Sequence, residues 1–231
     1  MKRLSVWFRR IVLALLGAVL LYQFWLFGWV LWWGQVNPTQ TRFMEIRLAE
    51  LRAKDSEARL RQSWLPYARI SPHLKRAIIA SEDAKFVDHE GFDWDGIQKA
   101  IEKNQKRGRV VAGGSTITQQ LAKNLFLSPA KTPWRKAEEA VITLMLEAFW
   151  SKQRILEVYL NVIEWGQGVF GAEAAARHYY GISAMQLSPE QAARLAGMVP
   201  NPRFYDRHRN APGLARKTAI ILGRMGAAEA P

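Results

Sequence analysis

The longest apolar stretch of the chain lies close to its amino end. Residues 11–33 carry no charged side chain, and a helix of that length crosses the roughly 30 Å hydrocarbon core of a bilayer. A cleaved signal peptide has a shorter apolar run of about 7–15 residues and a small-residue cleavage site, which the bulky Trp32-Trp33 pair does not provide. The pattern therefore predicts one transmembrane helix at 11–33.

The ten residues before this helix are basic and contain no acid. Cytoplasmic flanks of membrane helices are enriched in Lys and Arg, so residues 1–10 are expected to be a cytoplasmic tail. Everything after Gly34 is then expected on the opposite side of the membrane. The basic residues of this tail are Lys2, Arg3, Arg9 and Arg10.

Asn37-Pro38 is expected to end the membrane helix, since proline interrupts a helical pattern. Residues 39–62 are rich in charge and have only a thin apolar stripe, which favours one exposed helix. We therefore interpret residues 34–69 as a stalk or outer helix. A separate domain is expected over 70–231.

Apolar positions in the domain recur with helical spacing. Ser71-Pro72 is typical of a helix start, and a helix over 94–106 is expected to end at Gly108. Further helices are expected near 115–125, 134–150, 152–163, 172–180, 189–198 and 212–225. No stretch alternates over strand length, apart from short apolar pieces such as Val110-Val111. The domain is predicted to be mainly α.

Composition limits the chemistry that the domain can perform. The chain has no cysteine, which excludes a disulfide framework, a thiolate nucleophile and Cys-ligated zinc. Its formal net charge of +13 favours anionic partners such as diphosphates, acidic lipid headgroups or nucleic acid. Charge alone does not choose among them.

Glu82 follows the apolar segment Ala77–Ala80 at the end of a predicted helix. A carboxylate there can be partly desolvated, and burial raises its pKa toward the range useful for a general base. The alternative is an exposed acid at a helix end. Asp83, Phe86 and His89 are expected to support the loop that follows.

Gly113-Gly114-Ser115-Thr116 precedes an amphipathic helix. Free backbone N–H groups and the helix dipole make such a start an anion site, and Gln119 and Lys123 extend a row of donors along the same face as Ser115. The alternative is an ordinary serine cap with a solvated polar face.

A second carboxylate, Glu139, ends the basic segment Arg135-Lys136-Ala137-Glu138-Glu139. An ion pair between Arg135 and Glu139 on a helix surface would explain it, at about 0.3–0.5 kcal/mol. Lys131, Arg135 and Lys136 would add positive charge to an anion site.

Together these segments resemble family 51 of the glycosyltransferases, which polymerise peptidoglycan, and most closely its monofunctional biosynthetic transglycosylases. The resemblance covers about residues 70–205, an extent that no single short motif could explain. Near its end, Tyr205-Asp206-Arg207 lacks the proline of the family's Tyr-x-Pro. The segments that carry it are 82–91, 113–124, 135–139, 159–161, 168–176 and 198–202.

The resemblance implies a lysozyme-like, mainly α catalytic domain in the bacterial inner membrane, facing the periplasm. It implies polymerisation of lipid II, which is undecaprenyl-diphosphate-GlcNAc-MurNAc-peptide, into β-1,4 glycan strands with inversion. Glu82 would deprotonate the acceptor hydroxyl, and Glu139 would organise the cations or a divalent metal (Mg or Mn) near the diphosphate. The implied partners are lipid II, the growing strand, membrane lipids and proteins of cell-wall synthesis or division, with no nucleic acid. The residues expected to bind substrate and diphosphate are Ser115, Thr116, Gln119, Lys123, Lys131, Arg135 and Lys136, with Gly113 and Gly114 supporting them.

Three other interpretations compete with this one. Ser128-Pro129-Ala130-Lys131 fits the S-x-x-K pattern of serine enzymes that bind penicillin, but no K-T-G or S-D-N follows, so we interpret it as a turn. A lytic transglycosylase acting on finished peptidoglycan would need little anion binding. A membrane-tethered nucleic-acid or scaffold protein would also explain the charge.

Arg203, Arg207 and Arg209 are expected either to touch anionic headgroups or to aid solubility.

Overall fold

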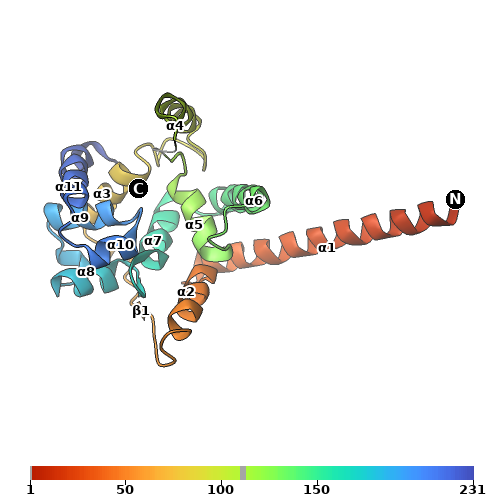
Figure 1. Ribbon diagram of the computed structural model, residues 1–231, viewed down its shortest axis with the longest axis horizontal. Helices are drawn as coiled ribbons and strands as arrows, with labels where there is room; N and C mark the ends of the chain where they lie inside the picture. Colours follow the sequence, from red (N-terminus) through yellow and green to blue (C-terminus); the bar gives the residue numbers. More distant parts are fainter. Residues whose placement is uncertain (1, 110–112) are drawn as a thin grey trace. The chain divides into compact units, whose positions relative to one another are not determined.

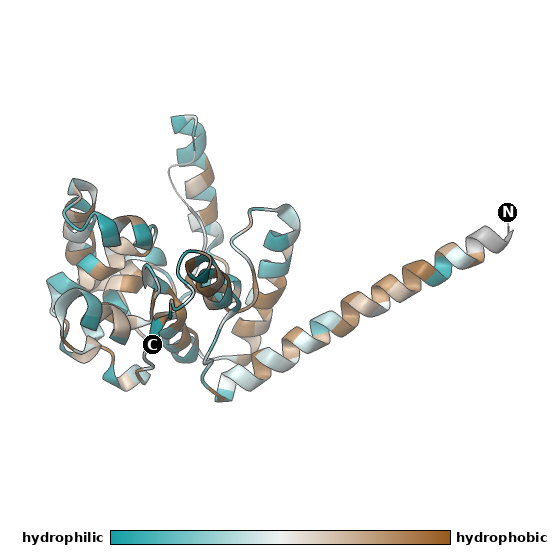
Figure 2. Ribbon diagram, turned by 60° about the horizontal axis from the view of Figure 1, so that its bottom comes forward, coloured by the Kyte–Doolittle hydropathy of each residue, from teal (hydrophilic) through white to brown (hydrophobic). Residues whose placement is uncertain are grey.

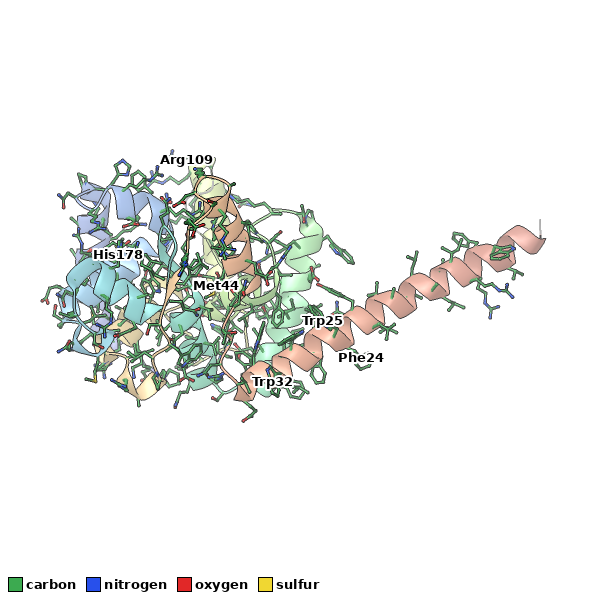
Figure 3. The ribbon with its side chains drawn as sticks, turned by 90° about the horizontal axis from the view of Figure 1, so that it is seen from below. Phe24, Trp25, Trp32, Met44, Arg109 and His178 are labelled. Atoms are coloured by element: carbon green, nitrogen blue, oxygen red, sulfur yellow. The ribbon has the colours of Figure 1, made fainter. Side chains whose placement is uncertain are left out.

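The computed structural model describes residues 2–109 and 113–231, and the chain divides into two compact units, Met1–Asn37 and Pro38–Pro231. Val110-Val111 therefore lies outside the described residues. The first unit is one helix, α1 (Lys2–Gln35), of which Val6–Gln35 is long and apolar enough to cross a membrane. Hydrophobic colour covers most of α1 (Figure 2), and the side chains of Phe24, Trp25 and Trp32 project from it (Figure 3).

The second unit is built mainly of helices, as predicted (Figure 1), and its described residues also form three very short strands. In chain order its α-helices and strands are α2 (Arg42–Arg52), β1 (Arg61–Gln62), α3 (Pro72–Glu82), α4 (Trp94–Arg107), α5 (Ile117–Phe126), α6 (Pro133–Phe149), α7 (Lys152–Val162), β2 (Glu164–Gly166), β3 (Val169–Phe170), α8 (Ala172–Tyr180), α9 (Pro189–Met198), α10 (Pro202–Arg207) and α11 (Pro212–Arg224).

Local sequence signals set most of the helix ends. The Ser71 hydroxyl accepts a hydrogen bond from the His73 N–H at 3.3 Å, and Pro72 is the first residue of α3. Gly108 ends α4 with a φ of +62°, a left-handed conformation that glycine adopts without a Cβ clash. Both ends are where the sequence predicts them.

The prediction of one helix over 39–62 is wrong in its length, because the observed helix α2 begins at Arg42 and ends at Arg52. The Asp55 side chain accepts a hydrogen bond from the Glu57 N–H at 3.1 Å, and such a local turn competes with helix formation. The chain then enters β1, where Arg61 pairs with Val169 and Gln62 with Phe170 in parallel.

The small sheet has the order β1-β3-β2, with β2 antiparallel to β3. Its strands are two or three residues long, too short to show an alternating pattern. The sheet ties the segment before α3 to the β2–β3 turn. Asn161 adds a second tie, since its buried side chain accepts from the Leu65 N–H at 2.8 Å and donates to the Leu65 carbonyl at 3.0 Å.

Two groups of helices form the core. α3, α9 and α11 pack against one another, and α5 packs against α2, α6 and α7. α4 lies at the edge of the unit (Figure 1). The end of α3 and the polar face of α5 thereby meet in the interior of the unit, where the candidate site lies.

Candidate active site

A cavity of about 260 Å³ lies where α3, α5, α6 and the turn after α9 meet. It brings together both predicted carboxylates and part of the predicted donor row. Its lining residues are Glu82, Ser115, Gln119, Gln120, Lys123, Glu139, Val199 and Pro200.

Glu82 is the last residue of α3, and the apolar face of this helix, which includes Leu74, Ala77 and Ile78, is buried. That burial holds the end of the helix against the cavity. The carboxylate accepts hydrogen bonds from the Gln120 amide at 2.9 Å and the Ser81 hydroxyl at 3.1 Å. Burial raises the pKa of Glu82 above its ordinary value, although these two donors act in the opposite direction. Glu82 thus has the environment of a general base.

Asp83 connects the loop after α3 to the start of α5. Its buried carboxylate pairs with the His89 ring nitrogen Nε2 at 2.9 Å and accepts from the Ile117 N–H at 3.0 Å. Phe86 is fully buried, with the Lys152 ammonium 4.7 Å from the centre of its ring. These three side chains hold the loop in place, and each lies outside the cavity lining.

The start of α5 is closed by internal hydrogen bonds. Thr116 and Gln119 form a capping box, in which each side chain bonds to the other's backbone N–H, at 3.2 and 3.1 Å. The Thr116 hydroxyl also donates to the Gly91 carbonyl at 2.7 Å, and Asp83 takes the Ile117 N–H. The backbone N–H groups of Thr116, Ile117 and Gln119, which were expected to be free to bind an anion, are therefore hydrogen-bonded within the protein.

The two glycines before this helix differ in their surroundings. A Cβ at Gly114 would lie 3.0 Å from the backbone of Ile97, so α4 approaches the chain closely there, whereas Gly113 faces open space. Ser115 is exposed and contributes to the cavity. Ser115 is thus the hydroxyl of this segment that remains open to a ligand.

Glu139 is buried on α6 and holds two cations. Its carboxylate oxygens accept from the Arg135 guanidinium and the Lys136 ammonium. Lys123 extends from α5 into the same cavity. Burial lowers the pKa of Lys123; Glu139 opposes that effect, and the charges of Arg135 and Lys136 add to it. Three basic groups consequently gather around one buried carboxylate.

Lys131 lies outside this cavity and lines a larger adjoining hollow of about 580 Å³. The two hollows share Gln120, Lys123, Val199 and Pro200, so they adjoin each other, and together they are called the groove. Arg203 and Arg207 add positive charge to its far part.

The far part of the groove contains another buried carboxylate, Glu164 of β2. It lies between the Arg47 and Arg203 guanidinium groups, each 3.1 Å away. Burial raises the pKa of Glu164 to about 7, against the opposing charge of Arg47. This cluster connects α2, β2 and α10. Asp206, in the segment that departs from the family pattern, accepts from the Gln167 N–H at 3.0 Å and pairs with His178 at 2.9 Å.

Sequence reasoning missed Gln120. The spacing of Ser115, Gln119 and Lys123 favoured Gln119 as a substrate-binding residue. The Gln119 side chain instead caps the start of α5, and the Gln120 side chain donates to Glu82. The sequence did contain a signal for Gln120. In a capping box the side chain of the N3 residue is hydrogen-bonded to the backbone, so the amide that follows it is the one free to reach the site.

The described residues contain no group of three or more His, Cys, Asp or Glu side chains arranged to hold a metal ion. Both oxygens of Glu139, the carboxylate considered for such a role, already accept from cations. The described side chains therefore do not form a metal-ligand set by themselves.

The chain is similar to known proteins over nearly all its length. A family model named Transglycosylase matches residues 49–226. The biosynthetic peptidoglycan transglycosylase of Dechloromonas aromatica is 74% identical over 231 residues, covering 100% of both chains. Proteins of the same name from Nitrosospira multiformis and Chromobacterium violaceum are 65% and 64% identical, covering 97% and 96% of this chain and 98% and 97% of their own.

Proposed function

Because the chain belongs to the transglycosylase family, we propose that it polymerises lipid II into β-1,4 glycan strands with inversion at the sugar. Its family makes it a glycosyltransferase of peptidoglycan synthesis. The observation that carries the proposal is one cavity lined by Glu82, Lys123 and Glu139, where Glu139 also pairs with Arg135 and Lys136. Base and anion-binding groups must face the same substrate pair for this reaction.

On the acceptor side, Glu82 is the general base. The 4-hydroxyl of the incoming lipid II attacks C1 of the donor sugar, and Glu82 takes the hydroxyl proton as the new C–O bond forms. A sugar hydroxyl is a weak nucleophile, so base assistance is worth about 10²–10⁴-fold. A raised pKa suits the task, because a base is most efficient when its pKa lies near the working pH.

On the donor side, the bond from C1 to the diphosphate oxygen breaks and the diphosphate leaves as an anion. This leaving group requires charge neutralisation more than protonation. Lys123, Arg135 and Lys136 provide positive charge, and Ser115 provides a hydroxyl donor at the cavity. An α-linked donor attacked from the opposite face gives a β linkage, without a covalent enzyme intermediate.

Glu139 organises these cations. Its carboxylate holds Arg135 and Lys136 beside a substrate that also attracts them. Without Glu139, mutual repulsion would spread the cations apart. Adding EDTA or Mg²⁺ during turnover tests whether a divalent ion contributes to this arrangement.

The chain is proposed to cross the bacterial inner membrane once through 11–33, with 1–10 in the cytoplasm and the catalytic unit in the periplasm. The basic 1–10 segment before an uncharged helix supports this orientation. An anchored enzyme meets its lipid-linked substrates at the bilayer surface. The catalytic domain is proposed to occupy 70–231, and the 34–69 segment packs against it through α2 and β1.

Two assays distinguish this function from its rivals. Purified protein is incubated with lipid II and, separately, with finished peptidoglycan. Strand growth from lipid II supports the proposal, and release of soluble muropeptides from finished peptidoglycan supports a lytic transglycosylase. A nucleic-acid protein would instead bind DNA or RNA with strong salt dependence and would not require Glu82.

Glu82→Gln is expected to remove polymerisation while keeping the fold. The amide has the same shape but cannot accept the proton, so turnover should fall by about 10²-fold or more. Glu90→Gln, at an exposed carboxylate in the following loop, is the matched control and should retain wild-type turnover. Retained polymerisation in Glu82→Gln, measured on lipid II, would show that Glu82 is not the base.

A further inference from the structure

A buried tyrosine that the proposed reaction does not use lies behind the candidate base. Tyr159, on α7, is fully buried, and its hydroxyl donates to the Gln120 side-chain oxygen at 2.8 Å. Burial raises the pKa of Tyr159 well above its ordinary value, and the charges of Glu82 and Asp83 act in the same direction. The Tyr159 hydroxyl therefore keeps its proton throughout the pH range in which the enzyme works.

This hydrogen bond determines which end of the Gln120 amide faces Glu82. With its oxygen occupied by the Tyr159 hydroxyl, the amide directs its NH2 group to the Glu82 carboxylate at 2.9 Å. The flipped amide would place its oxygen against a carboxylate oxygen, and two acceptors repel each other. An amide held by one partner is thus oriented for the other.

We propose that Tyr159 is a positioning residue for the reaction, acting through the Gln120 amide to hold the Glu82 carboxylate in its orientation toward the acceptor. The inference rests on the proposed role of Glu82 as base. A hydrogen bond donated to a carboxylate favours its ionised form, which is the form a base needs. The Tyr159–Gln120 relay therefore opposes the effect of burial on Glu82.

Other groups also act on Glu82, and they must stay constant in any test. The Ser81 hydroxyl of α3 donates to it, and the positive charges of Lys123 on α5 and Lys217 on α11 favour its ionised form. Asp83 is its neighbour in the chain, and Glu139 of α6 lines the same cavity. Replacing only the Tyr159 hydroxyl leaves all of these in place.

The test is Tyr159→Phe in the full-length, detergent-solubilised protein, with polymerisation of lipid II followed across pH. We expect kcat/KM at neutral pH to fall by up to about tenfold, since the hydrogen bond that orients the Gln120 amide toward Glu82 is lost. The acidic midpoint of the profile should move to higher pH, because the carboxylate loses support for its ionised form. Tyr180→Phe removes the hydroxyl of a half-buried tyrosine on α8, outside the cavity lining, and should change neither quantity.

A purely structural role for Tyr159 predicts a different result. It would lower thermal stability and the fraction of active enzyme but leave the midpoint unchanged, and that outcome overturns the proposal. A double variant supplies a second criterion. In a Gln120→Ala background, Tyr159→Phe should reduce kcat/KM less than twofold further, whereas multiplying effects would show that Tyr159 does not act through Gln120.

A readout without substrate separates this inference from the proposed function. Protein labelled with ¹³C-glutamate is titrated by NMR, and the Glu82 carboxyl signal is identified by its loss in Glu82→Gln. An upward shift of its titration midpoint in Tyr159→Phe supports the relay even if the wild type fails to polymerise lipid II, a failure that would count against the proposed function alone. Polymerisation by the wild type with an unmoved midpoint overturns the relay alone.

Discussion

At the scale of single residues, burial in the cavity shifts the pKa of a carboxylate and the pKa of an ammonium in opposite directions. Burial raises the pKa of Glu82 and lowers the pKa of Lys123, because a low dielectric disfavours either charge. In the proposed reaction, Glu82 must be ionised to accept a proton and Lys123 must be protonated to neutralise the diphosphate. The pH range in which both conditions hold is therefore narrower than for the free side chains.

Polymerisation of lipid II is accordingly expected to follow a bell-shaped dependence on pH. As pH falls, a base of raised pKa is protonated at a higher pH than the ordinary glutamate value of 4.5, which sets the acidic limb. As pH rises, a lysine of lowered pKa loses its charge below the ordinary 10.5, which sets the alkaline limb. Measuring kcat/KM across pH in the wild type tests both limbs.

Lys123→Arg assigns the alkaline limb. A guanidinium stays charged throughout this range, so the limb should move to higher pH even if the altered shape of the side chain lowers the maximum rate. Lys103→Arg, at an exposed position of α4, should leave the limb in place. An alkaline limb that is identical in Lys123→Arg and the wild type would exclude Lys123 as its source.

The sequence predicted which residues line the site better than it predicted the hydrogen bonds that each side chain makes. Glu82, Lys123 and Glu139 do line one cavity. Thr116 and Gln119 close a capping box, and Gln120 takes the place expected of Gln119. Helical periodicity fixes the face on which a residue lies but not which hydrogen bond its side chain selects, because that depends on partners such as Gly91 and Tyr159 that are distant in the chain.

At the scale of elements, the turn between β3 and α8 depends on one backbone conformation. Gly171 has a φ of +82° and a ψ of 152°, a region accessible almost only to glycine. An added Cβ would lie 2.7 Å from the Asn161 carbonyl oxygen. Asn161 is also the residue that ties α7 to the chain at Leu65, so a displaced backbone there would disturb more than the turn.

Gly171→Ala is therefore expected to destabilise the protein by about 3 kcal/mol or more, from backbone strain together with the clash. Gly181→Ala is its matched control, since Gly181 also has a positive φ, +71°, but its Cβ would meet open space. Its cost should be only about 1–2 kcal/mol. Denaturant unfolding of both variants tests the difference, and equal costs would contradict the clash.

The helices could be predicted because their signals are local, and the strands could not. Ser71-Pro72 and Gly108 determine helix ends by hydrogen bonds and dihedral angles within a few residues. β1 exists because Arg61 meets Val169 from far along the chain, and two-residue strands leave no periodic trace. The helix expected over 39–62 was too long for a different reason: its charge and periodicity did not reveal the local turn at Asp55.

At the scale of the whole molecule, two different forces can bring the chain to a bilayer. The net charge of +13 attracts anionic headgroups, an effect that salt screens within about 10 Å at 0.1 M. The apolar helix Val6–Gln35 acts through hydrophobic burial, which salt does not weaken. Vesicles of zwitterionic lipid at high salt isolate the second force.

Leu16→Arg/Leu20→Arg should abolish stable insertion under these conditions. Both leucines are more than half exposed on α1, and each arginine near the helix centre costs about 2.5–3.5 kcal/mol in a bilayer. The full-length variant should fail to float with the vesicles after detergent removal, while Leu16→Ala/Leu20→Ala, which adds no charge, should float like the wild type. Thermal unfolding of the catalytic unit in detergent should be equal in all three, because the substitutions lie in the other compact unit. Flotation of the arginine variant at high salt would mean that α1 is not what holds the protein in the membrane.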